Sequence, residues 1–312
     1  MIEGKSSVLV VGSVAVDWVI TPTAEREESV GGSATFFSMA ASYFGSVRLL
    51  GVVGSDFPEQ AISDLKGRGV DTGGLEIIPD GKTFRWKGRY HDNMNDRDTL
   101  DTQLNVFETF DPKLPTAYRE TDLLFLANIQ PDLQLRVLDQ MSGPKLVGLD
   151  TMNLWIGTAR AKLLQVLERV DVLMINEEEA RQLTEEPNLV KAAAMIGTMG
   201  PKSVVIKRGE YGALLFHGGK VFSAPALPLE AVVDPTGAGD SFAGGFMGYL
   251  ARCGDMTTEN LRAAMIYGSV LASFCVEGFS YDTIAALDHD KINARYEVFA
   301  NLTRFDDARL KD

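Results

Sequence analysis

Short apolar runs separated by helical patterns recur along most of this chain. The first is Val8–Val11, and similar runs follow at 47–53, 123–126, 146–149, 171–175 and 203–206. Apolar runs of this length are typical of strands that are covered on both faces. Their alternation with helical segments predicts an α/β protein whose central sheet is mainly parallel.

The segment from Thr83 to Phe110 departs from this pattern. Large and polar residues alternate over Phe84–Tyr90 and again over 101–107, with the polar stretch HDNMNDRD between them. This alternation predicts a half-exposed hairpin rather than a buried strand. Arg85 and Arg89 belong to it; they could reach an anionic substrate, but alternation favours an exposed strand face.

The charge balance of the chain restricts its partners. Lys and Arg number 30 against 43 Asp and Glu, for a net charge of −13. Nucleic acids and anionic membranes are bound by basic patches, so this balance argues against both. The first apolar run is only four residues long. We therefore expect no secretory signal or membrane span, and a cytoplasmic protein.

A glycine-rich turn before a helix stands out near the C-terminal end. In VVDPTGAGDSFAGGFMGYL (232–250), the turn Gly237-Ala238-Gly239 precedes a helical pattern that starts at Asp240. A helix N-terminus carries unpaired N–H groups and partial positive charge, so it can hold an anion. A carboxylate beside that anion is repelled, which makes sense if Asp240 accepts a proton from a hydroxyl that attacks phosphorus.

Other glycine-rich motifs do not fit this stretch. No Lys-Ser/Thr follows the glycines as in a Walker loop, and Phe242 stands where a dinucleotide fingerprint needs glycine. Ala243 replaces the second glycine of a nucleophile elbow. One structural alternative stays open, in which the turn is ordinary and Asp240 only caps the helix.

The segment DPTGAGDSF resembles the C-terminal signature of the ribokinase-like, or PfkB, kinases, which reads D-T-x-G-A-G-D. Pro235 occupies the Thr position, a substitution also met in that family. The resemblance implies that Gly237, Ala238 and Gly239 form the anion hole for the transferring phosphoryl group. It also implies that Asp240 is the catalytic base.

Candidate acceptor-binding residues come from several segments. Gly31 and Gly32 open a helix of small residues, which resembles the N-terminal PfkB signature. That family commonly has Asn four residues after the second glycine; Phe36, which stands there, could stack on a sugar or a base, or belong to the core. Asp17 lies just beyond the first strand, where open α/β sheets place ligands, and could instead be a surface carboxylate. Asn153 is a further candidate, with loop hydrogen bonding as its alternative.

Asn176 and Glu179 match the Asn-x-x-Glu motif of the same family, directly after an apolar run. Side chains at i and i+3 share one helix face, and oxygen ligands on one face can order Mg2+ directly or through its waters. The resemblance implies that Glu179, with Asn176 through water, serves the magnesium of the nucleotide. A plain helix cap is the alternative.

The nucleotide site is implied by two further segments. Lys207, Gly209 and Gly212 fit the family's nucleotide-phosphate loop, which has Lys or Thr followed by two spaced glycines. The predicted helix at 261–276 is dense in small residues, and the family brings this segment against adenine. Gly268 and Ser269 are the candidates there, since a flat apolar face suits a base.

In ribokinase-like proteins a small sheet covers the substrate and often forms a dimer face. We therefore expect one domain over residues 1–312, doubly wound around a mainly parallel sheet, with a β-sheet lid formed by about 16–30 and 83–110. A lid suits phosphoryl transfer because it keeps water from the reacting phosphate. A homodimer through this lid is one implied assembly.

The resemblance spans nearly the whole chain and implies a carbohydrate kinase that transfers the γ-phosphoryl of ATP to a hydroxyl of a small sugar-type substrate. Mg2+ is the implied cofactor, and activation by a monovalent cation is left open. An adenosine-like nucleoside acceptor is the alternative, favoured if Phe36, Trp18 and Trp86 line the pocket. A non-catalytic ligand sensor would carry a damaged base or anion hole, and this sequence has neither.

Overall fold

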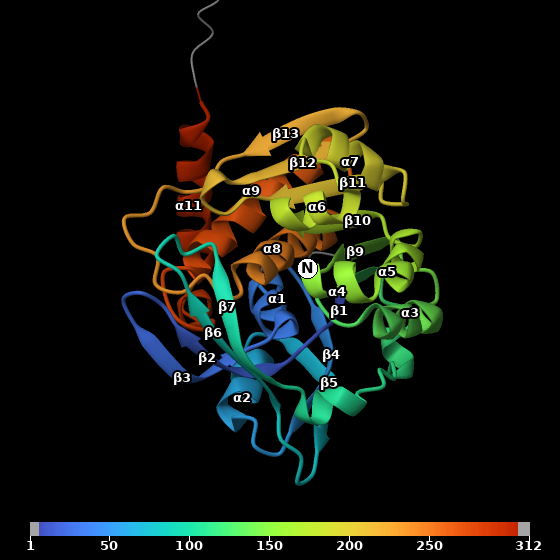
Figure 1. Cartoon of the computed structure of the whole chain (residues 1–312), viewed down its shortest axis with the longest axis vertical. Helices are drawn as coiled ribbons and strands as arrows, with labels where there is room; N and C mark the ends of the chain where they lie inside the picture. The colour runs from blue at the N-terminus through green and yellow to red at the C-terminus, as the bar shows by residue number, and fades with distance from the viewer. Residues whose placement is uncertain (1–5, 305–312) are drawn as a thin grey trace, which may run out of the picture.

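A nine-stranded sheet forms the centre of the molecule (Figure 1). The computed structural model describes residues 6–304. The parallel strands are, in sheet order, β11 (Ser203–Lys207), β10 (Val172–Asn176), β9 (Leu146–Asp150), β8 (Leu123–Leu126), β1 (Val8–Val11), β4 (Val47–Gly54) and β5 (Val70–Ile78). An antiparallel hairpin extends the sheet beyond β11, formed by β12 (Ala213–His217) and β13 (Lys220–Ala224). Within residues 6–304, no helix combines the length and apolar character needed to cross a membrane.

Helices cover both faces of the sheet because its strands are apolar on both faces. In β1, Val8 and Val10 join one core and Leu9 and Val11 the other, as the alternation of side chains along a strand requires. The first core is covered by α1 (Ser33–Ala41), α2 (Glu59–Gly67), α8 (Ala238–Cys253), α9 (Thr258–Cys275), α10 (Asp282–Ala285) and α11 (His289–Leu302). The second is covered by η1 (Asn105–Thr109), η2 (Thr116–Tyr118), α3 (Pro131–Gln140), α4 (Asn153–Thr158), α5 (Arg160–Leu167), α6 (Glu177–Thr184) and α7 (Leu189–Gly197). The predicted doubly wound, mainly parallel fold is confirmed.

The strand order reverses direction at β1. From β1 the chain builds outward through β4 and β5, and later from β8 through β11 on the other side. Loops that leave neighbouring strands in opposite directions open a crevice at the carboxyl edge of the sheet. Asp150, Asn176 and Lys207 are the last residues of β9, β10 and β11, so their polar side chains gather at this edge.

Glycines in α8 let three helices pack closely. A Cβ on Gly244 would lie 2.4 Å from the carbonyl oxygen of Phe37 in α1, and one on Gly245 would lie 2.7 Å from that of Tyr267 in α9. Both distances are below any normal contact, so larger residues would push the helices apart. The start of α8 is therefore held firmly against the start of α1.

A second, four-stranded sheet stands beside the first (Figure 1), in the order β3 (Glu25–Gly31), β2 (Ala15–Ile20), β6 (Phe84–Tyr90) and β7 (Arg97–Gln103). Its strands come from the two segments expected to form the lid, and we call it the lid sheet. Strand β2 follows β1 after a short loop. The lid sheet is thus joined directly to the strand at which the order of the central sheet reverses.

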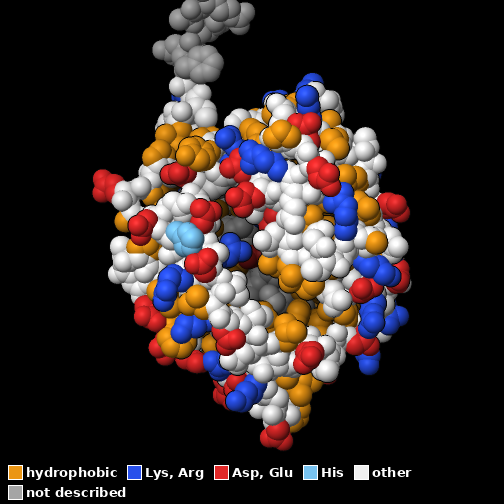
Figure 2. Space-filling view, in the orientation of Figure 1, with side chains coloured by type: hydrophobic (Ala, Val, Ile, Leu, Met, Phe, Trp, Pro, Cys, Tyr) orange, Lys and Arg blue, Asp and Glu red, His pale blue; other side chains and the backbone are white. Residues whose placement is uncertain are grey.

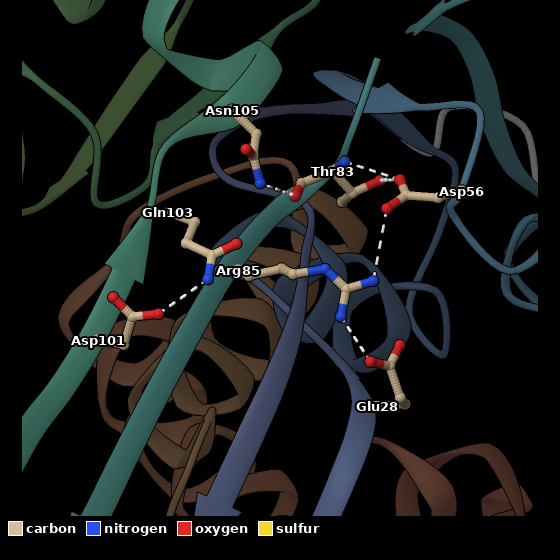
Figure 3. A network of polar contacts seen from close by, with 7 residues as sticks. All are labelled: Glu28, Asp56, Thr83, Arg85, Asp101, Gln103 and Asn105. Carbon is tan, nitrogen blue, oxygen red and sulfur yellow. Dashed lines mark hydrogen bonds and ion pairs between the residues drawn. The ribbon is translucent and has the colours of Figure 1, made fainter. Parts of the chain in front are cut away.

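Polar contacts fix the first residues of β6 to the end of β4 (Figure 3). The Asp56 carboxylate accepts hydrogen bonds of 2.7 Å from both the amide and the hydroxyl of Thr83, and Asn105 donates to the carbonyl of Thr83. Arg85 forms ion pairs with Glu28 and Asp56. The Arg85 side chain is thereby paired within the lid sheet and with its anchor.

Candidate active site

The glycine turn places the N-terminus of α8 at the crevice. Gly237 caps the helix with a φ of 78°, and a Cβ there would lie 2.3 Å from the ring of Phe36. Both the positive φ and the ring beneath it require glycine. The Ala238 amide donates to the carbonyl of Pro235, whereas within residues 6–304 no acceptor bonds the amides of Gly237 and Gly239. Those amides are available to an anion.

Asp240 stands in the first turn of this helix. Burial and the nearby charge of Asp150 raise its pKa to about 7, while Lys207 and Arg97 act in the opposite direction. A carboxylate with this pKa is close to half deprotonated at neutral pH, so it can both take up and release a proton there.

Lys207 brings a positive charge to the same place. Its Nζ donates to Oδ2 of Asp150 at 2.8 Å and lies 3.1 Å from where a Cβ on Gly239 would be. Burial acts to lower the pKa of Lys207, but the carboxylates of Asp150, Glu179 and Asp240 outweigh it, and the pKa is raised. The ammonium therefore stays charged beside the glycine turn.

Asp17 lies on the lid sheet and faces Asp234 and Asp240. The side chain is buried, and burial, followed by the charges of Asp234 and Asp240, raises its pKa to about 8. Gly31 makes the room for it, because a Cβ there would lie 1.9 Å from Oδ2 of Asp17. Gly32 has a φ of 95°, and a Cβ there would lie 2.4 Å from the carbonyl oxygen of Ser13 where α1 begins. Gly31 thus leaves room for Asp17 at the crevice, and Gly32 lets α1 start beside it.

Asn176 and Glu179 form a capping box at the start of α6. The Glu179 amide donates to Oδ1 of Asn176 at 2.8 Å, and the Asn176 amide donates to Oε2 of Glu179 at 2.9 Å. Burial raises the pKa of Glu179 to about 7, and the nearby charge of Asp150 contributes to this rise. The helix-capping alternative therefore holds geometrically, and it leaves Oε1 of Glu179 for other use.

The donor set suits a metal that keeps its water. Within residues 6–304, no group of three or more His, Cys, Asp or Glu side chains could hold an ion by itself. Mg2+ is usually bound by one or two carboxylates together with waters and substrate phosphates. Glu179, with Asn176 beside it, fits that kind of binding.

The Lys207–Gly212 segment lies under the tip of the lid sheet. Gly209 and Gly212 have φ values of 54° and 83°, and η3 (Gly209–Tyr211) spans the turn between them. A Cβ on Gly209 would lie 2.4 Å from Oδ1 of Asn95, in the turn between β6 and β7. The predicted nucleotide loop and the lid sheet are therefore in direct contact.

Two residues of the lid sheet were not singled out from the sequence. The Tyr90 hydroxyl lies 3.2 Å from Oγ1 of Thr236, just before the glycine turn, and Arg97 is the register partner of Tyr90 on β7. The charge of Arg97 opposes the rise in pKa of both Asp240 and Glu179. No local pattern could reveal the contact of Tyr90 with Thr236, because the two residues are 146 positions apart in the chain.

Other predicted site residues lie elsewhere. Phe36 is 1% exposed and supports Gly237 from below, so it belongs to the core and offers no ring face to a ligand. Gly268 packs against the backbone and ring of Phe242 between α8 and α9, and its contact with adenine stays a prediction. Ser269 donates to Met265 within its own helix. Asn153 is exposed and bonds the amide of Leu154, in line with the loop alternative.

Seen in the orientation of Figure 1, the surface of the molecule has a hollow with acidic and basic side chains on its rim (Figure 2). In chemical terms the crevice combines free amides and an ammonium for an anion with a carboxylate able to take a proton. A second buried acid, Asp17, is mostly protonated at neutral pH because its pKa is about 8, and it can both donate and accept hydrogen bonds with hydroxyl groups. This arrangement suits the transfer of a phosphoryl group to an alcohol.

Comparisons with known proteins agree with this chemistry. A family model described as pfkB family carbohydrate kinase matches residues 5–284. A cytidine kinase from Thermococcus kodakarensis is 32% identical over 253 residues, which cover 78% of this chain and 88% of that protein.

Solved structures share the fold. A Burkholderia thailandensis nucleoside kinase in complex with inosine has a TM-score of 0.77 at 20% identity, covering 93% of this chain and 97% of its own. A ribokinase from Cryptococcus neoformans var. grubii serotype A in complex with ADP has a TM-score of 0.75 at 24% identity, covering 93% and 99%. With a family match over most of its length, the chain belongs to the pfkB family of carbohydrate kinases, phosphotransferases whose acceptor is an alcohol group.

Proposed function

We propose that this protein transfers the γ-phosphoryl group of ATP to a hydroxyl of a small sugar-type substrate, with Asp240 as the catalytic base. One observation carries the proposal: a carboxylate with a pKa of about 7 lies in the first helical turn behind two free glycine amides. The Lys207 ammonium beside Gly239 completes a site for an anion that is attacked by an alcohol.

The residues divide the reaction between them. Asp17, with the backbone at Gly31 and Gly32, forms hydrogen bonds with the hydroxyl groups of the acceptor and orients it. As the acceptor oxygen bonds to phosphorus and the bond to ADP breaks, a carboxylate oxygen of Asp240 takes the hydroxyl proton. The Gly237 and Gly239 amides and Lys207 stabilise the charge on the phosphoryl oxygens.

Cofactors enter at the ends of β10 and β11. Glu179, with Asn176 through water, would hold Mg2+, which neutralises phosphate charge when bound. Lys207, Gly209 and Gly212 would face the nucleotide phosphates.

We also propose that a monovalent cation activates the enzyme. The assay described next tests this by replacing K+ with tetramethylammonium, and equal rates in the two salts would contradict it.

Acceptor classes are separated by one assay. ATP consumption is measured with ribose, other free sugars, cytidine, inosine and adenosine, each against a blank without acceptor. Free sugars follow from the family, and nucleosides are favoured by the likeness to a cytidine kinase. We expect at least one class to give turnover above the blank. Absence of acceptor-dependent ADP formation across the panel would contradict the proposed function.

The protein is further proposed to work in the cytoplasm, where ATP is supplied, and to dimerise through its lid sheet. Strand β7 is exposed along its whole length at the edge of that sheet, with Leu100 44% exposed, and exposed edges favour strand pairing. Sedimentation velocity should give a dimer, and Leu100→Lys should shift it toward monomer. A monomeric wild type would contradict this assembly, and cell fractionation checks the compartment.

A further inference from the structure

The two tryptophans of the lid sheet point to opposite faces. Trp86 is the register partner of Asp17, and Trp18 is the register partner of Lys87. Paired residues on neighbouring strands share a face and lie about 5 Å apart. The Lys87 ammonium lies 3.1 Å from the centroid of the Trp18 ring, so those two side chains share a face. Because side chains alternate along a strand and Asp17 is buried on the inner face, Trp18 and Lys87 are on the outer face. Trp86 therefore shares the inner face with Asp17.

The Trp86 ring is held flat along its own strand. A Cβ on Gly88 would lie 2.0 Å from Cη2 of Trp86, so only glycine leaves room for the ring there. The indole Nε1 donates to Oγ1 of Thr99 on β7 at 3.2 Å. Gly88 is buried beneath the ring, while Trp86 itself stays partly exposed. One ring face is thus covered by the sheet, and the other is left toward the crevice.

On the inner face of β6, Trp86 has different surroundings in the two directions along the strand. Two residues earlier, Phe84 packs against Phe107, with ring centroids 5.6 Å apart. Four residues later, Tyr90 reaches Thr236 beside the glycine turn. The inner face of β6 therefore runs from an aromatic end to the phosphate-transfer end, with Trp86 beside Asp17 between them.

We propose that Trp86 is a specificity-determining residue that stacks on the nucleobase of a nucleoside acceptor while Asp17 holds its ribose hydroxyls. This rests on the function proposed above and narrows its acceptor to nucleosides. A ring fixed on one side by Gly88 and Thr99 loses little freedom when a base stacks on the other, so the contact favours binding. Every base has an aromatic face, so this contact selects nucleosides over free sugars more than one base over another.

The test compares Trp86→Leu with Trp18→Leu, its matched control on the outer face. For Trp86→Leu we expect KM for cytidine and inosine to rise about 10- to 100-fold, the effect of losing one base stack. Values of kcat, of KM for ATP, and of kcat/KM for any ribose turnover should stay near wild type. Trp86→Tyr should recover most of the lost affinity. Trp18→Leu should behave as wild type.

Intrinsic fluorescence gives a second readout that does not depend on turnover. Cytidine should quench the emission of the wild type and of Trp18→Leu, but not of Trp86→Leu, with far-UV circular dichroism confirming that each variant is folded. An unchanged cytidine KM in Trp86→Leu, an equal loss for ribose, or a raised KM for ATP would overturn the assignment. A wild type that phosphorylates ribose but is neither quenched by cytidine nor active on nucleosides would overturn it while leaving the kinase function standing.

Discussion

Asp240→Asn should lower kcat about 100- to 10,000-fold, the usual contribution of a positioned general base. The amide has nearly the shape of the carboxylate but cannot take the hydroxyl proton at neutral pH. Dissociation constants for ATP and for the acceptor, measured by calorimetry, should change little. Asp290→Asn is the matched control, because Asp290 occupies the first turn of α11 as Asp240 does that of α8. Rates within a few-fold of wild type would contradict the role of Asp240.

We also expect Asp240→Asn to change how the rate depends on pH. Because burial and Asp150 raise the pKa of Asp240 to about 7, the active, deprotonated form is lost as pH falls below that value. In the wild type, kcat/KM for ATP, which reports the free enzyme, should be level above the pKa and fall about tenfold per pH unit below it. Asp240→Asn should lack this acid limb. A wild-type profile that is flat between pH 5 and 8 would count against a base at this position.

Lys207→Met should lower kcat/KM for ATP about 100- to 1,000-fold, comparable to the loss of one strong donor to a transition-state oxygen. The substitution removes the positive charge beside Gly239 and leaves Asp150, Glu179 and Asp240 without their shared cation. With that cation gone, the pKa of Asp240 should rise, and the acid limb of the kcat/KM profile should move to higher pH. A purely structural role for Lys207 would not move this limb.

Stability needs its own control, because Lys207 is 18% exposed and Asp150 only 7%. Removing one partner of a buried pair costs about 3–5 kcal/mol. Thermal unfolding should therefore show a lower Tm for Lys207→Met and partial recovery in Lys207→Met/Asp150→Leu, with activity still absent. Lys202→Met is the matched surface control, since Lys202 is 71% exposed and pairs with Asp171. Near-normal turnover in Lys207→Met would disprove its role.

The parallel core could be predicted from sequence where its strands are buried on both faces. Val8–Val11 and Leu123–Leu126 occupy the ranges that their apolar runs predict. Strand β5 gives no such pattern, since it lies at the sheet edge and carries Asp71, Gly73 and Gly74. The segment 153–167 forms two helices that meet at Ala159, where the backbone φ is −131°.

Site residues that end strands or begin helices could be placed from sequence, because the edge of a parallel sheet gathers them. Lys207 and Asp240 meet for this reason. Contacts that depend on how the lid sheet folds over could not be predicted, such as Asn95 against Gly209. Gly268 shows another limit, since small residues on a helix can equally serve a ligand or a neighbouring helix.

The glycine contacts of α8 with α1 and α9 have a consequence for how members of this fold can diverge. Because Gly244 and Gly245 leave no space for a larger side chain, α8 with its phosphate-binding turn is packed tightly into the body of the protein. Asp17 and its neighbours stand instead on a separate sheet at the rim. Natural variation can therefore change which acceptor the enzyme binds by altering the lid sheet, without changing the part that does the chemistry.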